Sequence, residues 1–169
     1  NNKMEAFTFY LTSAVTIVAM IMVISRTNPV HSMMYLVVSS ISMAVIFYIL
    51  GAPFAAALEI LVYAGAILVL FVFAIMMLNL GHESVEQERS LLTPGIWTGP
   101  SMLSVILLGV LGFIITGESP QSPATSVSPK EVGVALYGPY LLAVELGSML
   151  LMAGLIGAYH LGRPLLKKD

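Results

Sequence analysis

The chain has 169 residues, of which 58% are hydrophobic and only 9% charged, and its formal net charge is −2 at pH 7. A soluble domain carries roughly 25% charged residues, so nine acids and seven bases exclude a water-soluble globular protein and indicate a membrane protein. The slightly acidic balance offers no basic face and excludes a nucleic-acid partner. The chain has no cysteine, which excludes disulfides, thiolate-bound iron–sulfur clusters and cysteine zinc sites on it.

Apolar runs of membrane-spanning length follow one another along the chain. A helix needs about 20 apolar residues, at 1.5 Å per residue, to cross ~30 Å of hydrocarbon. The first run is longer than the apolar region of a signal peptide and no A-x-A-like cleavage site follows it, so we interpret it as a retained helix. We predict an all-α, polytopic membrane protein that forms a single membrane domain over residues 1–169. Its five transmembrane helices are predicted at residues 7–24, 32–50, 54–79, 97–115 and 137–159.

Local signals separate these helices. Asn28-Pro29 is typical of a helix start, with asparagine as the N-cap and proline in the first turn. Gly51-Ala52-Pro53 predicts a turn before the third helix. The segment 117–129 is rich in Ser, Pro and Thr, which predicts a solvated loop before the fifth helix.

The basic residues predict the orientation of the chain in the membrane. An odd number of spans places the two termini on opposite sides. Lys3 and Lys130 fall on the side of the N-terminus. The other five bases fall on the side of the C-terminus: Arg26, Arg89, Arg163, Lys167 and Lys168. The positive-inside rule therefore places the N-terminus outside and the C-terminus in the cytoplasm.

Two carboxylic acids lie inside predicted membrane helices, Glu59 in the third and Glu145 in the fifth. Such groups are costly in hydrocarbon and by default mark a proton or ion pathway. Counted from the turns before them, both lie roughly 7–12 Å into the membrane, so they could contribute to one polar layer. The alternative, in which each carboxyl only joins neighbouring helices through hydrogen bonds, stays open.

Further residues of interest lie close to these acids. Tyr63 follows Glu59 by four positions and shares its helix face, where its hydroxyl could extend a polar track or its ring could pack against a neighbouring helix. Gly65 permits close helix packing and can also mark a π-bulge. Small residues at four-residue spacing favour a fifth helix packed inside a larger assembly: Ala143 with Gly147, Ala153 with Gly157, and Gly154 with Ala158. The sequence contains no catalytic motif and no spacing of metal ligands.

The third helix carries the most specific pattern. Its run Glu59-Ile60-Leu61-Val62-Tyr63-Ala64-Gly65-Ala66-Ile67 continues through Phe73 and is followed by Met76-Met77-Leu78-Asn79-Leu80. This run resembles the third helix of the subunit J family of bacterial NADH:quinone oxidoreductase (respiratory complex I), whose mitochondrial counterpart is subunit six. Thr27-Asn28-Pro29-Val30-His31 and Gly138-Pro139-Tyr140 also resemble that family, and the resemblance covers nearly the whole chain.

The resemblance implies a subunit of the membrane arm that has no redox centre of its own and lies in the bacterial inner membrane. The isolated chain is then not expected to be catalytic. No cofactor is expected on it, since FMN, iron–sulfur clusters and quinone would be held by other subunits. Its expected neighbours are subunits A, H, K and N and the lipid bilayer.

The resemblance also implies a π-bulge in the third helix, near Tyr63–Val69, which can convert to regular α-helix and so gate a water path for proton pumping. Carried onto this chain, Tyr63, Gly65 and Val69 form the helix switch. Glu59, Tyr63 and Glu145 are the candidates for the proton path. Three alternatives stay open: a standalone proton or cation channel, an assembly scaffold without a gating role, and the equivalent subunit of a related hydrogenase, Fpo-type or antiporter complex.

Overall fold

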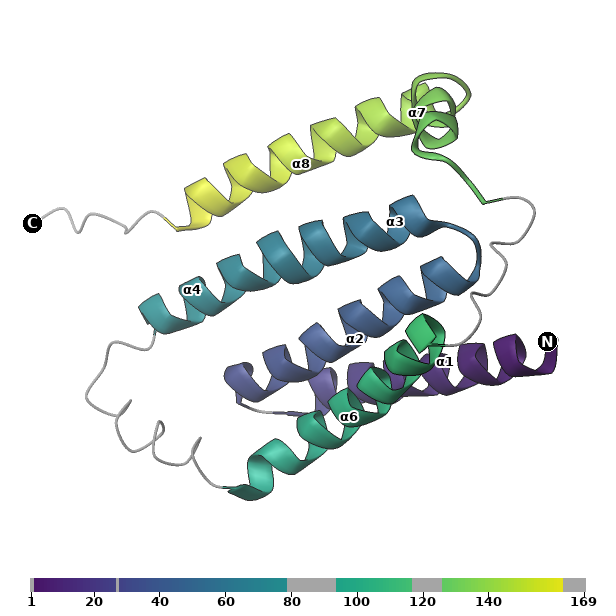
Figure 1. Ribbon diagram of the computed structural model, residues 1–169. Helices are drawn as coiled ribbons and strands as arrows, with labels where there is room; N and C mark the ends of the chain where they lie inside the picture. Colours follow the sequence, from purple (N-terminus) through teal and green to yellow (C-terminus); the bar gives the residue numbers. More distant parts are fainter. Residues whose placement is uncertain (1, 27, 79–93, 117–125, 163–169) are drawn as a thin grey trace, which may run out of the picture. The chain divides into compact units, whose positions relative to one another are not determined.

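The computed structural model describes residues 2–26, 28–78, 94–116 and 126–162 (Figure 1). Within these ranges the regular secondary structure is entirely helical, and five helices are long and apolar enough to cross a membrane. The predicted all-α fold with five spans is therefore confirmed. The chain divides into two compact units, Asn1–Val127 and Ser128–Asp169, which are described separately below.

The first unit contains four of the spans (Figure 1). The third span is one continuous helix of three segments, in which a π-helix, η1, lies between two α-helical segments. Helix α2 is central, since it contacts α1, all three segments of the third span and α6. The bounds are α1 Asn2–Ser25, α2 Pro29–Ile49, α3 Pro53–Leu58, η1 Glu59–Ile67, α4 Leu68–Leu78 and α6 Pro94–Thr116.

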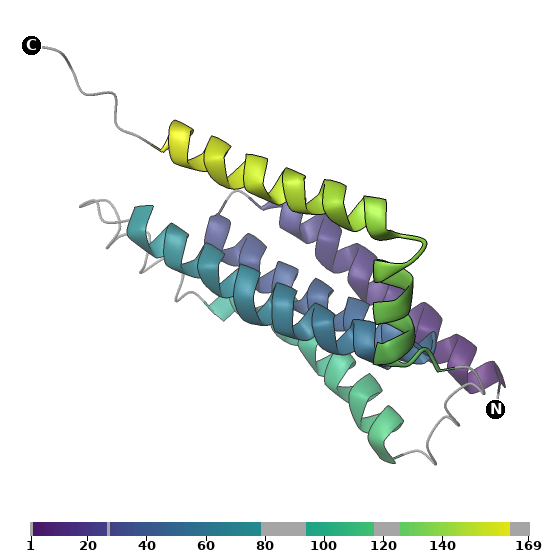
Figure 2. The ribbon, with the colours of Figure 1, turned by 90° about the horizontal axis from the view of Figure 1, so that it is seen from above.

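The second unit contains a short helix, α7 (Pro129–Tyr137), and the fifth span, α8 (Leu141–Leu161). Figure 2 shows α7 running across the end of α8. The predicted helix over 137–159 therefore begins too early, because residues 138–140 form a turn. Pro139 has no backbone N–H and disfavours the helical conformation of Gly138, so it separates the two helices.

The predicted helix-start signal at Asn28-Pro29 and the predicted turn at Gly51 are confirmed in atomic detail, although α2 begins at Pro29, three residues before the predicted start at residue 32. Asn28 caps the helix, since its side-chain oxygen accepts a hydrogen bond from the Val30 backbone N–H at 3.0 Å. At the other end Gly51 adopts a left-handed φ of 80°. The backbone N–H of Gly51 donates to the Tyr48 carbonyl at 3.1 Å, and that of Ala52 donates to the Phe47 carbonyl at 2.9 Å. This pair of bonds is a Schellman motif, which ends α2 and turns the chain into the third span.

The packed core of the first unit lies where α1, α2 and α6 meet. One buried cluster is formed by Val15, Ala19 and Val38. A second is formed by Val45, Leu107 and Val110. The third span contributes few buried side chains, Ala56 in α3 and Leu68 in α4. The core therefore holds α1, α2 and α6 together and leaves most of the third span at the surface of the chain.

Tyr35 of α2 fits into a gap that Gly99 of α6 leaves. The Tyr35 side chain is 3% exposed, and a Cβ added at Gly99 would overlap its hydroxyl oxygen. The Arg26 guanidinium carbon lies 5.8 Å from the centre of the same ring, within the range of a cation–π contact. One aromatic ring thus links the end of α1 to α2 and α6.

We expect Gly99→Ala to destabilise the first unit by about 1–3 kcal/mol, the usual cost of overpacking. Tyr35→Phe removes the overlapping hydroxyl, so the double variant should recover part of the loss. The measurement is the midpoint temperature at which the chain dissociates from the detergent-extracted assembly. Equal midpoints for Gly99→Ala and the native chain would show that the gap is not needed.

Candidate functional site

The third span changes its backbone hydrogen bonding at Glu59. The Glu59 N–H still donates to the Ala55 carbonyl, four residues back, as in an α-helix. At the other end of η1 the Leu68 N–H donates to the Tyr63 carbonyl, five residues back, as in a π-helix. π-helices are rare, are mostly limited to a single turn and occur frequently at functional sites. The nine π-helical residues from Glu59 to Ile67 therefore make this stretch the candidate functional site.

Gly65 lies within the π-helix, close to the backbone of the preceding turn. A Cβ added there would lie 3.4 Å from the Ile60 carbonyl oxygen. That distance allows an alanine in ordinary van der Waals contact, whereas a β-branched residue must place two more methyl groups beside the same turn. Glycine also lowers the cost of an unusual winding, because it is a weak helix former.

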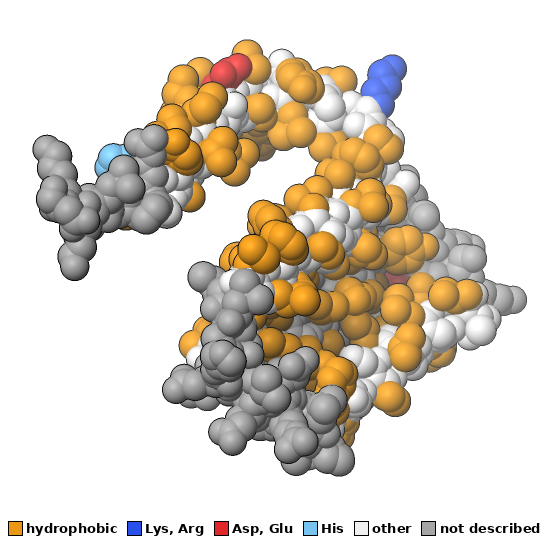
Figure 3. Space-filling view, turned by 90° about the vertical axis from the view of Figure 1, so that its left-hand side faces the viewer, with side chains coloured by type: hydrophobic (Ala, Val, Ile, Leu, Met, Phe, Trp, Pro, Cys, Tyr) orange, Lys and Arg blue, Asp and Glu red, His pale blue; other side chains and the backbone are white. Residues whose placement is uncertain are grey.

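The π-helix is poorly packed within the first unit. None of its nine residues is buried, whereas Ala56 before it and Leu68 after it are. Leu61, Val62 and Tyr63 are all more than two-fifths exposed. Figure 3 shows apolar side chains over much of the visible surface. A change of winding between Ala56 and Leu68 would therefore break few side-chain contacts within the chain.

The structure places three of the predicted site residues on this element. Glu59 is the first residue of η1 and is partly exposed, and Tyr63 and Gly65 follow it within η1. Val69 lies in α4, outside the π-helix. The π-helix therefore includes much of the predicted stretch Tyr63–Val69 but starts four residues earlier and ends at Ile67.

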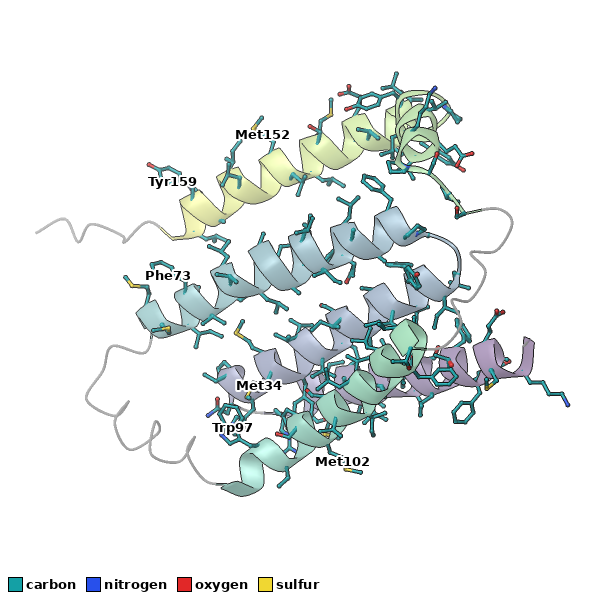
Figure 4. The ribbon with its side chains drawn as sticks, in the orientation of Figure 1. Met34, Phe73, Trp97, Met102, Met152 and Tyr159 are labelled. Atoms are coloured by element: carbon teal, nitrogen blue, oxygen red, sulfur yellow. The ribbon has the colours of Figure 1, made fainter. Side chains whose placement is uncertain are left out.

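Glu145 belongs to the second unit and lies in α8, where no side chain is buried within that unit. Met152 and Tyr159 point to one side of α8 (Figure 4), and Glu145, which precedes Met152 by two helical turns, lies on the same face. Gly147 and Gly154 lie on the opposite face by the same periodicity. A polar layer shared by Glu145 and Glu59 stays a prediction, because the two acids belong to different units.

A line of buried hydroxyl groups lies between α1 and α2, and its residues are not among those predicted from the sequence. Thr8, Thr12 and Thr16 each donate to the carbonyl four residues back, at 2.8–2.9 Å. The Thr16 and Ser42 hydroxyl oxygens lie 2.7 Å apart, and Ser42 also contacts the Ser39 carbonyl at 2.9 Å. The hydroxyl groups of Thr16 and Ser42 have two hydrogens for these three contacts: one with each other and one with a backbone carbonyl each. When one hydroxyl donates to the other, it therefore gives up its own hydrogen bond to the backbone. The four-residue spacing of the threonines is the signal that could have revealed this line.

We expect the bond between Thr16 and Ser42 to contribute about 0.6 kcal/mol, and at most about 1.7, as such bonds do in membrane bundles. The measurement is a double-mutant cycle of Thr16→Val and Ser42→Ala, read from the SDS concentration that releases the chain from its assembly. Additive effects of the two substitutions would contradict a direct bond.

Comparison with known proteins identifies the family. The family model described as NADH-ubiquinone/plastoquinone oxidoreductase chain 6 matches residues 19–161. The chain is 55% identical to NADH-quinone oxidoreductase subunit J of Pseudomonas aeruginosa over 160 residues, which cover 93% of this chain and 96% of the relative. The corresponding protein of Escherichia coli K12 is 53% identical over 158 residues, 93% of this chain and 86% of the relative. That of Buchnera aphidicola from Schizaphis graminum is 46% identical, with 93% and 97% coverage.

Proposed function

Because the chain belongs to the subunit J family of NADH-quinone oxidoreductase, and is thus a membrane subunit of that complex, we propose that its third span couples quinone reduction to proton pumping. The observation that carries the proposal is the π-helix Glu59–Ile67, which lies between two α-helical segments and has no buried side chain. An element with two accessible windings can serve as a two-state switch.

The proposed switch works by rotation. When the stretch changes from hydrogen bonds five residues apart to bonds four residues apart, the number of residues per turn falls. Side chains after the stretch then rotate relative to those before it. In the π form a side chain of the Tyr63–Val69 stretch blocks a water path, and in the α form that face turns away and water enters. Quinone chemistry in a neighbouring subunit biases one winding over the other, with a free-energy difference of a few kcal/mol between them.

The proton path in this proposal begins at the start of the switch. Glu59 stands at the residue where the π-helix begins, and Tyr63 lies about one turn further along the same element. The carboxyl group takes up and releases the proton, and the phenol hydroxyl continues the polar track. Glu145 on α8 is the second carboxyl group of the path.

The surroundings of the chain follow from the same proposal. A carboxyl group on a helix surrounded only by lipid is costly, and Glu145 lies on a helix that its own unit does not bury. We therefore place another subunit against the Glu145 face, with subunits A, H, K and N as the neighbours. The complex lies in the bacterial inner membrane, with the N-terminus of this chain outside. FMN, iron–sulfur clusters and quinone are held by the other subunits, so this chain has no redox centre.

A second candidate function is that of an assembly scaffold without gating. The lack of any buried residue in α8 within its own unit favours it, since such a surface is available for docking by partners. Substitutions in η1 distinguish the two functions. A scaffold would lose subunits from the complex, whereas a gate would lose coupling while all subunits are retained. The names of the relatives favour NADH-quinone oxidoreductase over a related hydrogenase or antiporter complex.

The first experiment is affinity purification of the tagged full chain from detergent-extracted membranes. We expect NADH:quinone oxidoreductase activity and the other subunits to co-purify with it. Proton or cation transport by the purified chain alone in liposomes, without these subunits, would instead support a standalone channel.

A further inference from the structure

The geometry of the second unit places α7 at a membrane surface. Helix α8 has 21 residues, which rise about 31 Å and cross the bilayer. Helix α7 has nine residues, which rise only about 13 Å and cannot cross it. The turn of residues 138–140 keeps the end of α7 within about 14 Å of the start of α8. Because α7 runs across the end of α8 (Figure 2), it lies roughly in the plane of the membrane.

The chemistry of α7 changes from polar to apolar along its length. Its first turn contains Lys130 and Glu131, and its last turn contains Val134, Leu136 and Tyr137. Val134 is 65% exposed and Tyr137 is 77% exposed, so the second unit itself leaves these apolar groups uncovered. Tyrosine is enriched at membrane–water interfaces, where its ring meets the acyl chains and its hydroxyl meets water.

The first turn of α7 is polar and suited to contact with water. Ser128 and Glu131 form a capping box, in which the Ser128 N–H donates to the Glu131 carboxylate at 2.7 Å and the Glu131 N–H donates to the Ser128 hydroxyl at 3.3 Å. Hydrogen bonding to Ser128, through its backbone first and its side chain second, lowers the pKa of Glu131. The cap is therefore present above the ordinary glutamate pKa and is lost as the pH falls through the lowered value.

We propose that α7 is an interfacial helix that binds the phospholipid surface on the side of the membrane where the N-terminus of the chain lies. Val134 and Tyr137, which are three residues apart and share one face of the helix, enter the boundary between headgroups and acyl chains, and Lys130 on the same face reaches the lipid phosphates. Lipid is the occupant because the apolar groups of α7 continue those of a membrane-spanning helix, and because the positive charge of Lys130 complements phosphate.

The absence of cysteine from the chain provides a direct test, since an introduced cysteine is the only one that can shift its band on a blot. Lys130→Cys, Val134→Cys and Tyr137→Cys are made in the intact complex, and membranes are treated with a membrane-impermeant polyethylene-glycol maleimide. We expect labelling at 134 and 137 to be about tenfold slower than at 130, because an apolar boundary disfavours the reactive thiolate. Equal rates in SDS-denatured samples are the control.

A photo-crosslinker distinguishes lipid from protein as the occupant. Benzoylphenylalanine is introduced in place of Tyr137, or in place of Val134 as a second variant, and the irradiated chain is weighed by mass spectrometry. We expect an added mass of one phospholipid. A crosslink to another subunit, or labelling of Tyr137→Cys as fast as Lys130→Cys, would overturn the proposal.

Discussion

Gly65→Val lowers NADH-driven quinone reduction and proton pumping by about tenfold while the complex still assembles, if the third span works as a switch. The reason is local: the added side chain crowds the turn that contains the Ile60 carbonyl oxygen, which lies 3.4 Å from the Cβ position. A bias of about 1.4 kcal/mol between two windings changes their ratio tenfold, and overpacking commonly costs this much. The measurements are NADH oxidation and dye-detected proton uptake in inverted membrane vesicles, with assembly followed on native gels.

Two matched variants make this prediction specific. Gly65→Ala adds only the Cβ that fits at contact distance, so its effect should be much smaller. Gly109→Val makes the same substitution at an exposed glycine of α6 where nothing lies within 4 Å of the added Cβ, so it controls for valine in a membrane helix. Normal pumping in Gly65→Val, or equal losses in Gly65→Val and Gly109→Val, would argue against the switch.

For Glu59→Gln we expect a loss of proton pumping of about tenfold, with the complex still assembled. Glutamine keeps the size and hydrogen-bonding capacity of the side chain but cannot exchange a proton, so the substitution separates titration from polarity. The measurement is the ratio of protons pumped to NADH oxidised in vesicles.

Two further variants, Glu59→Leu and Glu145→Gln, are compared with Glu59→Gln. Glu59→Leu removes polarity as well as the proton, so an additional loss of assembly in this variant reports a structural role of the carboxyl group. Glu145→Gln asks the same question of the second acid, on α8. Unchanged pumping in Glu59→Gln would reduce Glu59 to a structural hydrogen-bonding group.

Much of the fold could be predicted because its signals are local. Asn28-Pro29 and Gly51 mark the two ends of α2, and each does so through backbone chemistry that depends on a few neighbouring residues. The five spans follow from the length of apolar runs. Helix α7 escaped prediction although its start signal is also local. Its capping box at Ser128 and Glu131 lies at the end of a Ser- and Pro-rich segment, whose composition is typical of a loop.

The candidate site could be predicted only in part. The specific run around Tyr63 locates it, but the start of the π-helix at Glu59 does not follow from the sequence. A helix that is apolar on all sides has no periodicity that distinguishes bonds four residues apart from bonds five residues apart. The contact between Thr16 and Ser42 could not be predicted either. A hydroxyl group in a helix can donate to a carbonyl of its own helix, so the sequence does not indicate a partner on a second helix.

In the proposed switch, the turn between α2 and α3 would determine in which direction a re-wound third span extends. Gly51 accepts a hydrogen bond from the Val127 N–H at 3.0 Å while the Schellman motif holds the turn to α2, so the Pro53 end of the third span is clamped. A π turn contains more residues than an α turn, and re-winding nine residues to α therefore lengthens the rod as well as rotating it. In the proposed switch, with the Pro53 end held, the whole extension would appear at the Leu78 end. The third span would then act as a small piston whose movement reaches the opposite face of the membrane.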